Sequence, residues 1–357
     1  MEIDRSNHTP IYLQFYKILK EKIMECAPGD TIPPERVLCE QYSVDRTTVR
    51  RALAMLAKEK LIERKRGSGT RVLPRPTDTS DGNTVLFCLY HSTSHTERLS
   101  EPFYARSIDA FEQYLRKFDK RIVYSSLRSD EDIAALYRQF NALAIILAGA
   151  VDDAMVTQCL DLPVSVVTYN NRTNGLSSAL SDNAQGTQMA AEHLLALNHR
   201  KIGFIDVQGY YNASVRLDAF RNTLLRNAMP SDTLCIAEGN WSEQSGYAAM
   251  KELLAKHPDM TALYAGNDSM AIGAIRAAQQ AGLRVPDDIS VIGFDDIPQA
   301  STNTPALTTV RVDISAMVEA TYMLLFNINE EKHRAKIHTI ASTKLIVRDS
   351  TGKAKQL

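Results

Sequence analysis

The sequence has few cysteines and no long apolar run, and each of these absences excludes a class of protein. The cysteines lie far apart, form no Cys-x-x-Cys pair and number only five: Cys26, Cys39, Cys88, Cys159 and Cys235. This spacing argues against a zinc site, and an odd number of cysteines is typical of a reducing compartment. No apolar stretch approaches 18 residues, so no membrane span is expected. The N-terminus starts with charged residues and lacks the apolar core of a signal peptide, so we predict a cytoplasmic protein.

The motifs of common enzyme classes are also missing. The chain has no P-loop and no Gly-x-Ser-x-Gly, and its eight histidines show no metal-binding spacing. The pair Gly67-x-Gly69 lies in a predicted hairpin rather than at a strand-to-helix turn, so it does not indicate a dinucleotide site. We therefore predict a protein that is not an enzyme, with no catalytic residues, no metal and no cofactor. The alternative from another class is an enzyme with a DNA-binding domain, and turnover of a bound ligand would support it.

Charge is distributed unevenly along the chain. Residues 1–76 contain 15 Lys and Arg against 10 Asp and Glu, whereas the remainder contains 26 against 32. A basic segment joined to an acidic one suits a protein that presents one end to a polyanion.

The first 72 residues show the pattern of three helices followed by a hairpin. Helical spacing of apolar residues predicts helices over 10–25, 34–42 and 45–58, and Asp45 is a plausible N-cap for the third. Residues 61–64 and 70–72 flank a Gly-containing turn as two strands. Because the third helix carries Arg and Thr on its exposed side, the pattern predicts a winged helix-turn-helix whose third helix enters a DNA groove.

Beyond residue 72 the pattern changes twice. Residues 73–83 contain two prolines, one glycine and a single large apolar side chain, which is the composition of a linker. From Thr84 to about residue 350, short apolar strands alternate with helical segments, which predicts parallel sheets with right-handed crossovers. The expected strands are 84–90, 121–126, 143–147, 163–167, 201–205, 233–237, 261–264 and 289–293. Their number favours two Rossmann-like lobes with a ligand-binding cleft between them.

Residues 1–72 resemble the GntR family of winged-helix regulators. The matching stretches are Pro10-Ile11-Tyr12, Pro28-Gly29-Asp30, Ile32-Pro33-Pro34-Glu35-Arg36, Asp45 to Leu53, Leu61 to Arg64 and Gly67-Ser68-Gly69-Thr70. In that family the second helix, the recognition helix and the wing tip contact DNA. The resemblance implies the same role for Arg36, Arg46, Thr47, Thr48, Arg50, Arg66 and Gly67. Arginine reads guanine with two hydrogen bonds, and threonine typically holds phosphates.

Residues 84–350 resemble the effector-binding domain of the LacI/GalR family, a two-lobed fold like that of type I periplasmic binding proteins. The matching stretches are 181–186, 192–202, Gly239-Asn240-Trp241 with Ser245-Gly246-Tyr247, 267–273, 282–296 and 305–310. The combination is similar to the arabinose-responsive repressors, which join a GntR head to a LacI-type body. The hinge helix of ordinary LacI proteins is absent here, because residues 73–83 are too rich in proline.

The resemblance implies a cleft that binds a small molecule. The residues that match effector contacts are Arg216, Trp241, Asn267 and Asp295, with Phe103 as a candidate wall of the N-terminal lobe. An aromatic ring against the C–H face of a sugar, with charged partners on its hydroxyls, is suited to a polyol. Core packing is the alternative role for Trp241 and Phe103, and a cap or an interlobe ion pair is the alternative for Asp295. The family often has Asp five residues after the proline of the fourth strand. That count from Pro163 reaches Thr168, so one usual sugar contact is missing or altered here.

The sequence thus predicts an effector-controlled transcription factor, a repressor of sugar-utilisation genes. We expect a homodimer that binds a palindromic double-stranded DNA operator and a small sugar. The alternative effector is a purine or nucleoside, because purine-responsive members share this body. Those members usually have Phe at the position of Trp241, so the tryptophan favours a sugar.

Overall fold

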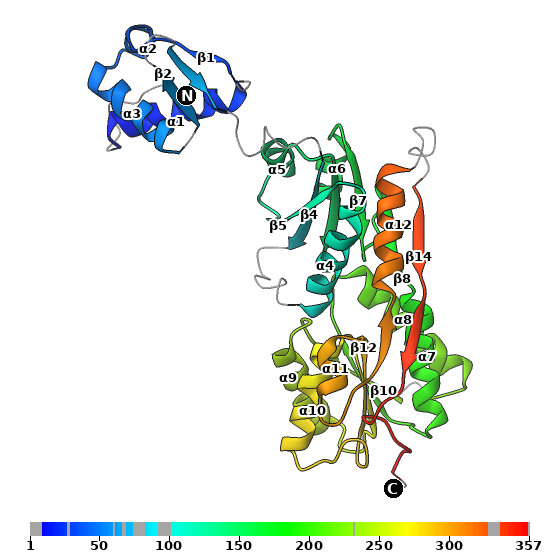
Figure 1. The fold of residues 1–357 in the computed structure, drawn as a ribbon. Coiled ribbons are helices and arrows are strands. Elements are labelled where there is room, and N and C mark those ends of the chain that lie inside the picture. The colour runs from blue at the N-terminus through cyan, green and yellow to red at the C-terminus, as the bar shows by residue number, and fades with distance from the viewer. Residues whose placement is uncertain are drawn as a thin grey trace. The chain divides into compact units, whose positions relative to one another are not determined.

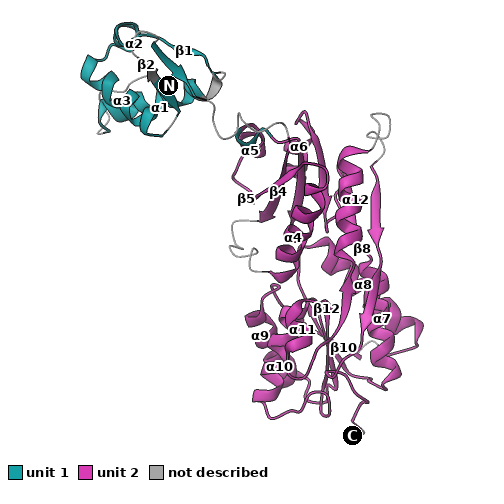
Figure 2. Cartoon of the chain, in the orientation of Figure 1, with its two compact units in different colours: residues 1–82, 139–141 teal, residues 83–138, 142–357 magenta. Residues whose placement is uncertain are grey.

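The computed structural model describes residues 9–26, 29–59, 61–65, 69–73, 83–91, 101–230, 233–327 and 336–355. The chain divides into two compact units, one of residues 1–82 and 139–141 and one of residues 83–138 and 142–357 (Figure 2). Residues 74–82, which form most of the predicted linker, lie outside the described residues. No described helix is both long and apolar enough to cross a membrane.

The first unit is a winged helix-turn-helix, as predicted. Its helices are α1 (Ile11–Glu25), α2 (Glu35–Tyr42) and α3 (Arg46–Lys58). A small antiparallel sheet follows the order β1-β3-β2 and consists of β1 (Thr31–Ile32), β3 (Gly69–Val72) and β2 (Ile62–Lys65). Phe15, Leu38 and Val49 are buried between the helices, because apolar residues recur at helical spacing on one side of each.

The second unit has two lobes, each built on a six-stranded sheet covered by helices (Figure 1). The N-terminal lobe has the strand order β14-β8-β7-β6-β4-β5, all parallel. Its strands are β4 (Thr84–His91), β5 (Arg121–Arg128), β6 (Ala144–Gly149), β7 (Ser165–Tyr169), β8 (Ser177–Ser181) and β14 (His338–Ala341). Its helices are α4 (Pro102–Arg116), α5 (Ile133–Phe140), α6 (Asp153–Leu160) and α12 (Ile314–Phe326).

The C-terminal lobe has the order β10-β9-β11-β12-β13-β15, in which only β15 is antiparallel to its neighbour. Its strands are β9 (Ile202–Asp206), β10 (Leu234–Glu238), β11 (Ala262–Ala265), β12 (Ser290–Asp295), β13 (Thr308–Val312) and β15 (Thr343–Ile346). Its helices are α7 (Asn183–Ala196), α8 (Tyr211–Arg226), α9 (Glu243–Lys256), α10 (Asp268–Gln280) and α11 (Pro298–Thr302).

The chain crosses between the lobes at three places: between β8 and α7, between β13 and α12, and between β14 and β15. Each crossing is short. Short connections of this kind can absorb the backbone rotation of a hinge, so the fold permits the lobes to open and close around their cleft.

The two-lobed α/β fold was predicted correctly, but four strands of the second unit were not. All eight predicted strands form. The strands β8, β13, β14 and β15 were missed, and all four take part in the lobe crossings. The predicted parallel pairing holds throughout the two sheets except at β15, which runs antiparallel to β13 and forms an edge of the C-terminal sheet.

Candidate functional site

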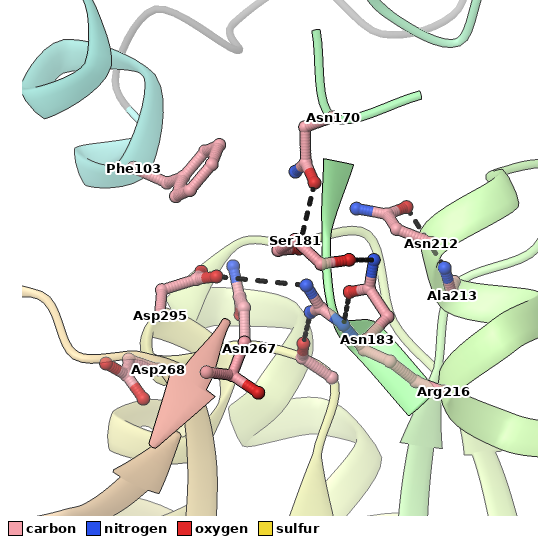
Figure 3. A network of polar contacts seen from close by, with 12 residues as sticks. Phe103, Asn170, Ser181, Asn183, Asn212, Ala213, Arg216, Asn267, Asp268 and Asp295 are labelled. Carbon is pink, nitrogen blue, oxygen red and sulfur yellow. Dashed lines mark hydrogen bonds and ion pairs between the residues drawn. The ribbon is translucent and has the colours of Figure 1, made fainter. Parts of the chain in front are cut away.

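A cavity lies between the two lobes, where strands of both sheets end. Its empty space, counted together with the solvent space at its mouth, is about 260 Å³. The residues that line it are Glu101, Phe103, Tyr104, Asn170, Asn212, Arg216, Trp241, Asn267 and Asp295. All five residues predicted to contact an effector are therefore in one place, although they come from separate parts of the chain. Figure 3 shows four of them, Phe103, Arg216, Asn267 and Asp295. Such a crevice at the carboxyl ends of parallel strands is the usual ligand site of α/β folds.

Arg216 is the central cation of the cavity. It lies on α8 with only 2% of its surface exposed. Its Nε donates to Oδ1 of Asn183 at 2.8 Å, and its Nη1 donates to the carbonyl of Gly266 (Figure 3). The guanidinium carbon lies 3.6 Å from the ring centroid of Phe294. These contacts hold the guanidinium in one orientation, with Nη2 directed toward a carboxylate of the cavity wall.

That carboxylate belongs to Asp295, the last residue of β12. One of its oxygens lies 3.9 Å from Nη2 of Arg216, which is long for an ion pair. Its pKa is raised to about 7, mainly by burial and also by Glu101, while Arg216 and Arg106 act to lower it. Asp295 also has a positive φ of 115°, a conformation that is strained for a residue with a side chain. A buried carboxyl with a pKa near neutrality can donate or accept a hydrogen bond to a hydroxyl group.

Asn267 and Trp241 form the C-terminal-lobe wall through the starts of two helices. Asn267 caps α10, since its Oδ1 accepts from the backbone N–H of Met270 at 2.9 Å. Its Nδ2 donates to the carbonyl of Trp241 at 3.0 Å. Trp241 is 4% exposed with a φ of 71°, and its ring packs edge-on against Tyr210. Its indole N–H is buried and has no hydrogen-bond partner in the described part of the chain.

The N-terminal lobe contributes an aromatic and an amide to the opposite wall. Phe103 is 5% exposed and stacks on Tyr169 at 6.2 Å between ring centroids, so it serves the core as well as the cavity. Asn170 follows β7, has a φ of 55° and accepts a hydrogen bond from Ser181 at 3.2 Å.

Sequence reasoning missed four of the residues that line the cavity: Glu101, Tyr104, Asn170 and Asn212. Thr168 stands where the family often has a sugar-binding Asp, and it does not line the cavity. It is fully buried and donates its hydroxyl to the carbonyl of Asn171 at 2.8 Å. Asn170 is the cavity residue that follows this strand, two positions later. The available signal was an Asn directly after an apolar strand, where a positive φ is tolerated.

The first unit displays part of the predicted DNA-binding set on its surface. Asp45 caps α3, as predicted, by accepting from the backbone N–H of Thr48 at 2.9 Å. Arg46 and Thr47 are exposed in the first turn of α3, and Arg50 is exposed one turn later. These three side chains form a continuous polar surface at the start of the helix.

The other predicted DNA contacts differ in their surroundings. Arg36 is exposed on α2, with its Nε 3.8 Å from Glu40, and Arg50 donates to Glu35 at 3.0 Å. Thr48 is 9% exposed, and its hydroxyl donates to Asp45 at 2.7 Å, so its side chain supports the cap of α3. Arg66 and Gly67 lie outside the described residues.

Two family models match this chain. One is described as bacterial regulatory proteins of the gntR family and matches residues 11–72. The other is a periplasmic binding protein-like domain and matches residues 191–351. The two matches do not overlap, and each falls within one of the compact units.

The curated relatives are transcriptional repressors. A probable HTH-type transcriptional repressor ExuR from Bacillus subtilis is 29% identical over 270 residues, which cover 72% of this chain and 78% of the relative. The HTH-type transcriptional repressor PurR from Klebsiella pneumoniae is 33% identical over 191 residues, which cover 52% of this chain and 56% of the relative. The match to PurR thus spans little more than half of that protein.

Solved structures show the same fold. A LacI-family regulator from Enterococcus faecium, solved with bound ribose, superposes with a TM-score of 0.67 at 23% identity and covers 76% of this chain and 100% of its own. The dimeric Lac repressor superposes with a TM-score of 0.65 at 24% identity, with the same coverage. The chain therefore joins a GntR-type helix-turn-helix domain at residues 11–72 to a periplasmic-binding-protein-like domain with the LacI-type fold.

Proposed function

We propose that this protein represses carbohydrate-utilisation genes and that a small sugar in the interlobe cleft controls its binding to operator DNA. The observation that carries the proposal is the cavity between the lobes, where Trp241, Arg216 and Asp295 meet. We propose domain boundaries at 1–72 for the DNA-binding head and 84–350 for the effector-binding body, with 73–83 as the linker. Two heads on a homodimer would bind a palindromic duplex operator.

The chemistry of the cavity suits a small polyol. Asn170, Asn212 and Asn267 offer amide donors and acceptors, while Arg216 and Asp295 add a guanidinium and a carboxyl group. Hydroxyl groups both donate and accept, so a sugar can use all of these partners. The unpartnered indole N–H of Trp241 would donate a hydrogen bond to a ligand oxygen.

Control of DNA binding follows from lobe closure. A ligand moves an equilibrium between two states only by its difference in affinity for them. A sugar held by both walls of the cavity binds the closed arrangement better than the open one. Because each head is joined to the N-terminal lobe of its body, closure in a dimer would change the spacing of the two heads.

The second candidate effector is a purine or nucleoside. The similarity to the repressors named PurR favours it. A flat base could pack against the indole of Trp241, with the asparagine amides on its polar edges.

A ligand screen tests the effector. Full-length protein would be melted with pentoses, hexoses, sugar phosphates, polyols and nucleobases in turn. A sugar at about 100 Kd is expected to add about 2.7 kcal/mol to stability, and Trp241→Ala should remove that increment relative to its own ligand-free baseline. Trp241→Phe is the matched variant, because it keeps a ring in place.

Each result of the screen decides between the candidates. A sugar that loses its effect in Trp241→Ala supports the proposal. A nucleobase that stabilises both the wild type and Trp241→Phe makes the second candidate correct. If no compound of the panel raises the melting temperature, the sugar assignment is contradicted. DNA binding is tested by a separate experiment.

The DNA-binding residues are tested through Arg50. We propose that Arg36, Arg46, Thr47, Thr48, Arg50, Arg66 and Gly67 contact DNA. With a duplex selected by the wild-type protein from a random-sequence library, Arg50→Ala is expected to weaken specific binding by about 1–3 kcal/mol. Lys58→Ala, at the other end of α3, is the matched control and should have a smaller effect on sequence preference. Unchanged affinity of Arg50→Ala for the selected duplex would remove Arg50 from the interface.

A further inference from the structure

One side chain of the N-terminal lobe reaches across the cleft to the backbone of the C-terminal lobe. Arg106 lies on α4, and its Nη1 donates to the carbonyl of Asp296 at 2.7 Å. The same nitrogen lies 3.5 Å from the carbonyl of Asp295. Arg106 does not line the cavity, although it contacts the backbone of a residue that does.

The acceptor of this bond is held firmly. The carboxylate of Asp296 accepts from Nε of Arg311 and from Nη2 of Arg348, both at 2.6 Å. Its φ of 54° directs the peptide at the end of β12 away from an extended path. The carbonyl is therefore fixed to the C-terminal lobe by two ion pairs.

The donor is also held firmly, because α4 is anchored to its own lobe. Phe103 stacks on Tyr169, and the hydroxyl of Tyr169 donates to Ser107 at 3.0 Å. Arg106 lies between these two anchored residues of α4. Since both ends are fixed to their lobes, the bond between Arg106 and Asp296 cannot survive separation of the lobes.

We infer that Arg106 is a latch that stabilises the closed arrangement of the lobes. The inference deepens the proposed function and rests on it in one respect, namely that an effector must enter the cavity. Arg216, Trp241 and Asp295 are each at most 7% exposed, so entry requires the lobes to open and the latch to break. Arg106 is thus a positioning residue that sets the fraction of open protein and, through it, the apparent affinity for an effector.

The test measures opening directly, without an effector. Trp241 is the only tryptophan and lines the cavity, so quenching of its fluorescence by acrylamide reports opening of the full-length protein. Arg106→Met removes the donor and keeps the length of the side chain. We expect it to raise the ratio of open to closed protein about fivefold, as loss of one ordinary hydrogen bond would, and so to increase the quenching constant.

Two further variants make the result specific. Arg106→Lys keeps a long donor and is expected to restore quenching toward the wild-type value. Arg116→Met is the control on the same helix, where the exposed guanidinium pairs with Glu112. A far-ultraviolet melt confirms that each variant is folded.

Quenching of Arg106→Met at the wild-type value would overturn the latch. An equal increase in Arg116→Met would also overturn it, because the effect would then follow from loss of charge on α4. Neither result bears on the identity of the effector, so failure of the latch is distinguishable from failure of the proposed function.

Discussion

Gly273→Ala is expected to destabilise the C-terminal lobe by about 3 kcal/mol or more, although alanine is the better helix former. Gly273 lies where α10 crosses α9, and a Cβ at this position would lie 1.9 Å from the carbonyl oxygen of Glu243. Gly246 faces the same crossing from α9, and its Cβ would lie 2.1 Å from the carbonyl oxygen of Met270. Both obstacles are backbone atoms, so they can move only if the helices separate.

The gain in helix propensity is about 1 kcal/mol, which is smaller than the expected cost of overpacking. Separation of the helices would also disturb the cavity, because Asn267 caps α10 and Trp241 precedes α9. Thermal and denaturant unfolding of the body measure the change in stability, and the ligand screen measures the loss of binding.

Gly352→Ala is the matched control for this prediction. Its Cβ would lie 3.4 Å from the side chain of Pro286, an ordinary contact. We expect its stability to stay close to that of the wild type. A Gly273→Ala protein as stable as Gly352→Ala would show that the two helices do not pack as closely as described.

Asp295→Asn is expected to change the pH dependence of stability. Because the pKa of Asp295 in the folded protein is raised to about 7, the folded state binds this proton more tightly than the unfolded chain. The stabilisation is complete below the unfolded pKa near 4 and is lost as pH rises through about 7. Asn cannot ionise, so the variant should gain about 2–4 kcal/mol relative to wild type between pH 5 and pH 8.

The next residue, Asp296, is a control because its pKa is shifted in the opposite direction. Burial alone would raise the pKa of Asp296, but hydrogen bonds from Arg348 and Arg311 lower it overall. Its stabilisation is present above the unfolded pKa and is lost as pH falls through the folded value. Asp296→Asn should therefore be less stable than wild type at neutral pH, with a difference that shrinks in acid. Melting curves recorded without ligand at several pH values measure both differences. If the stability of wild type and of Asp295→Asn depended on pH in the same way, the raised pKa of Asp295 would be contradicted.

Local signals in the sequence predicted much of the head. Asp45 before an apolar-periodic run predicts an N-cap, and the cap forms. The alternation of strands and helices in the body is also a local signal, because each short apolar run marks one buried strand. That alternation predicts the two-lobed α/β fold. Such signals depend only on neighbouring residues, which is why they can be read directly.

Cavity residues beyond the matched motifs were not predictable in this way. Thr168 and Asn170 both belong to the end of one strand, yet only Asn170 reaches the cavity, because Thr168 hydrogen-bonds within its own lobe. Arg106 has no motif at all, and its partner lies 190 residues away.

The sequence by itself determined the order and kind of the elements, the GntR-type and LacI-type motifs, and five residues that line the cavity. Only the tertiary structure decided which polar groups share that cavity, how strongly burial perturbs Asp295, and which side chain joins the lobes. The physical reason is that periodicity and capping arise between residues close in sequence. Burial, electrostatic fields and contacts between lobes arise between residues brought together by folding.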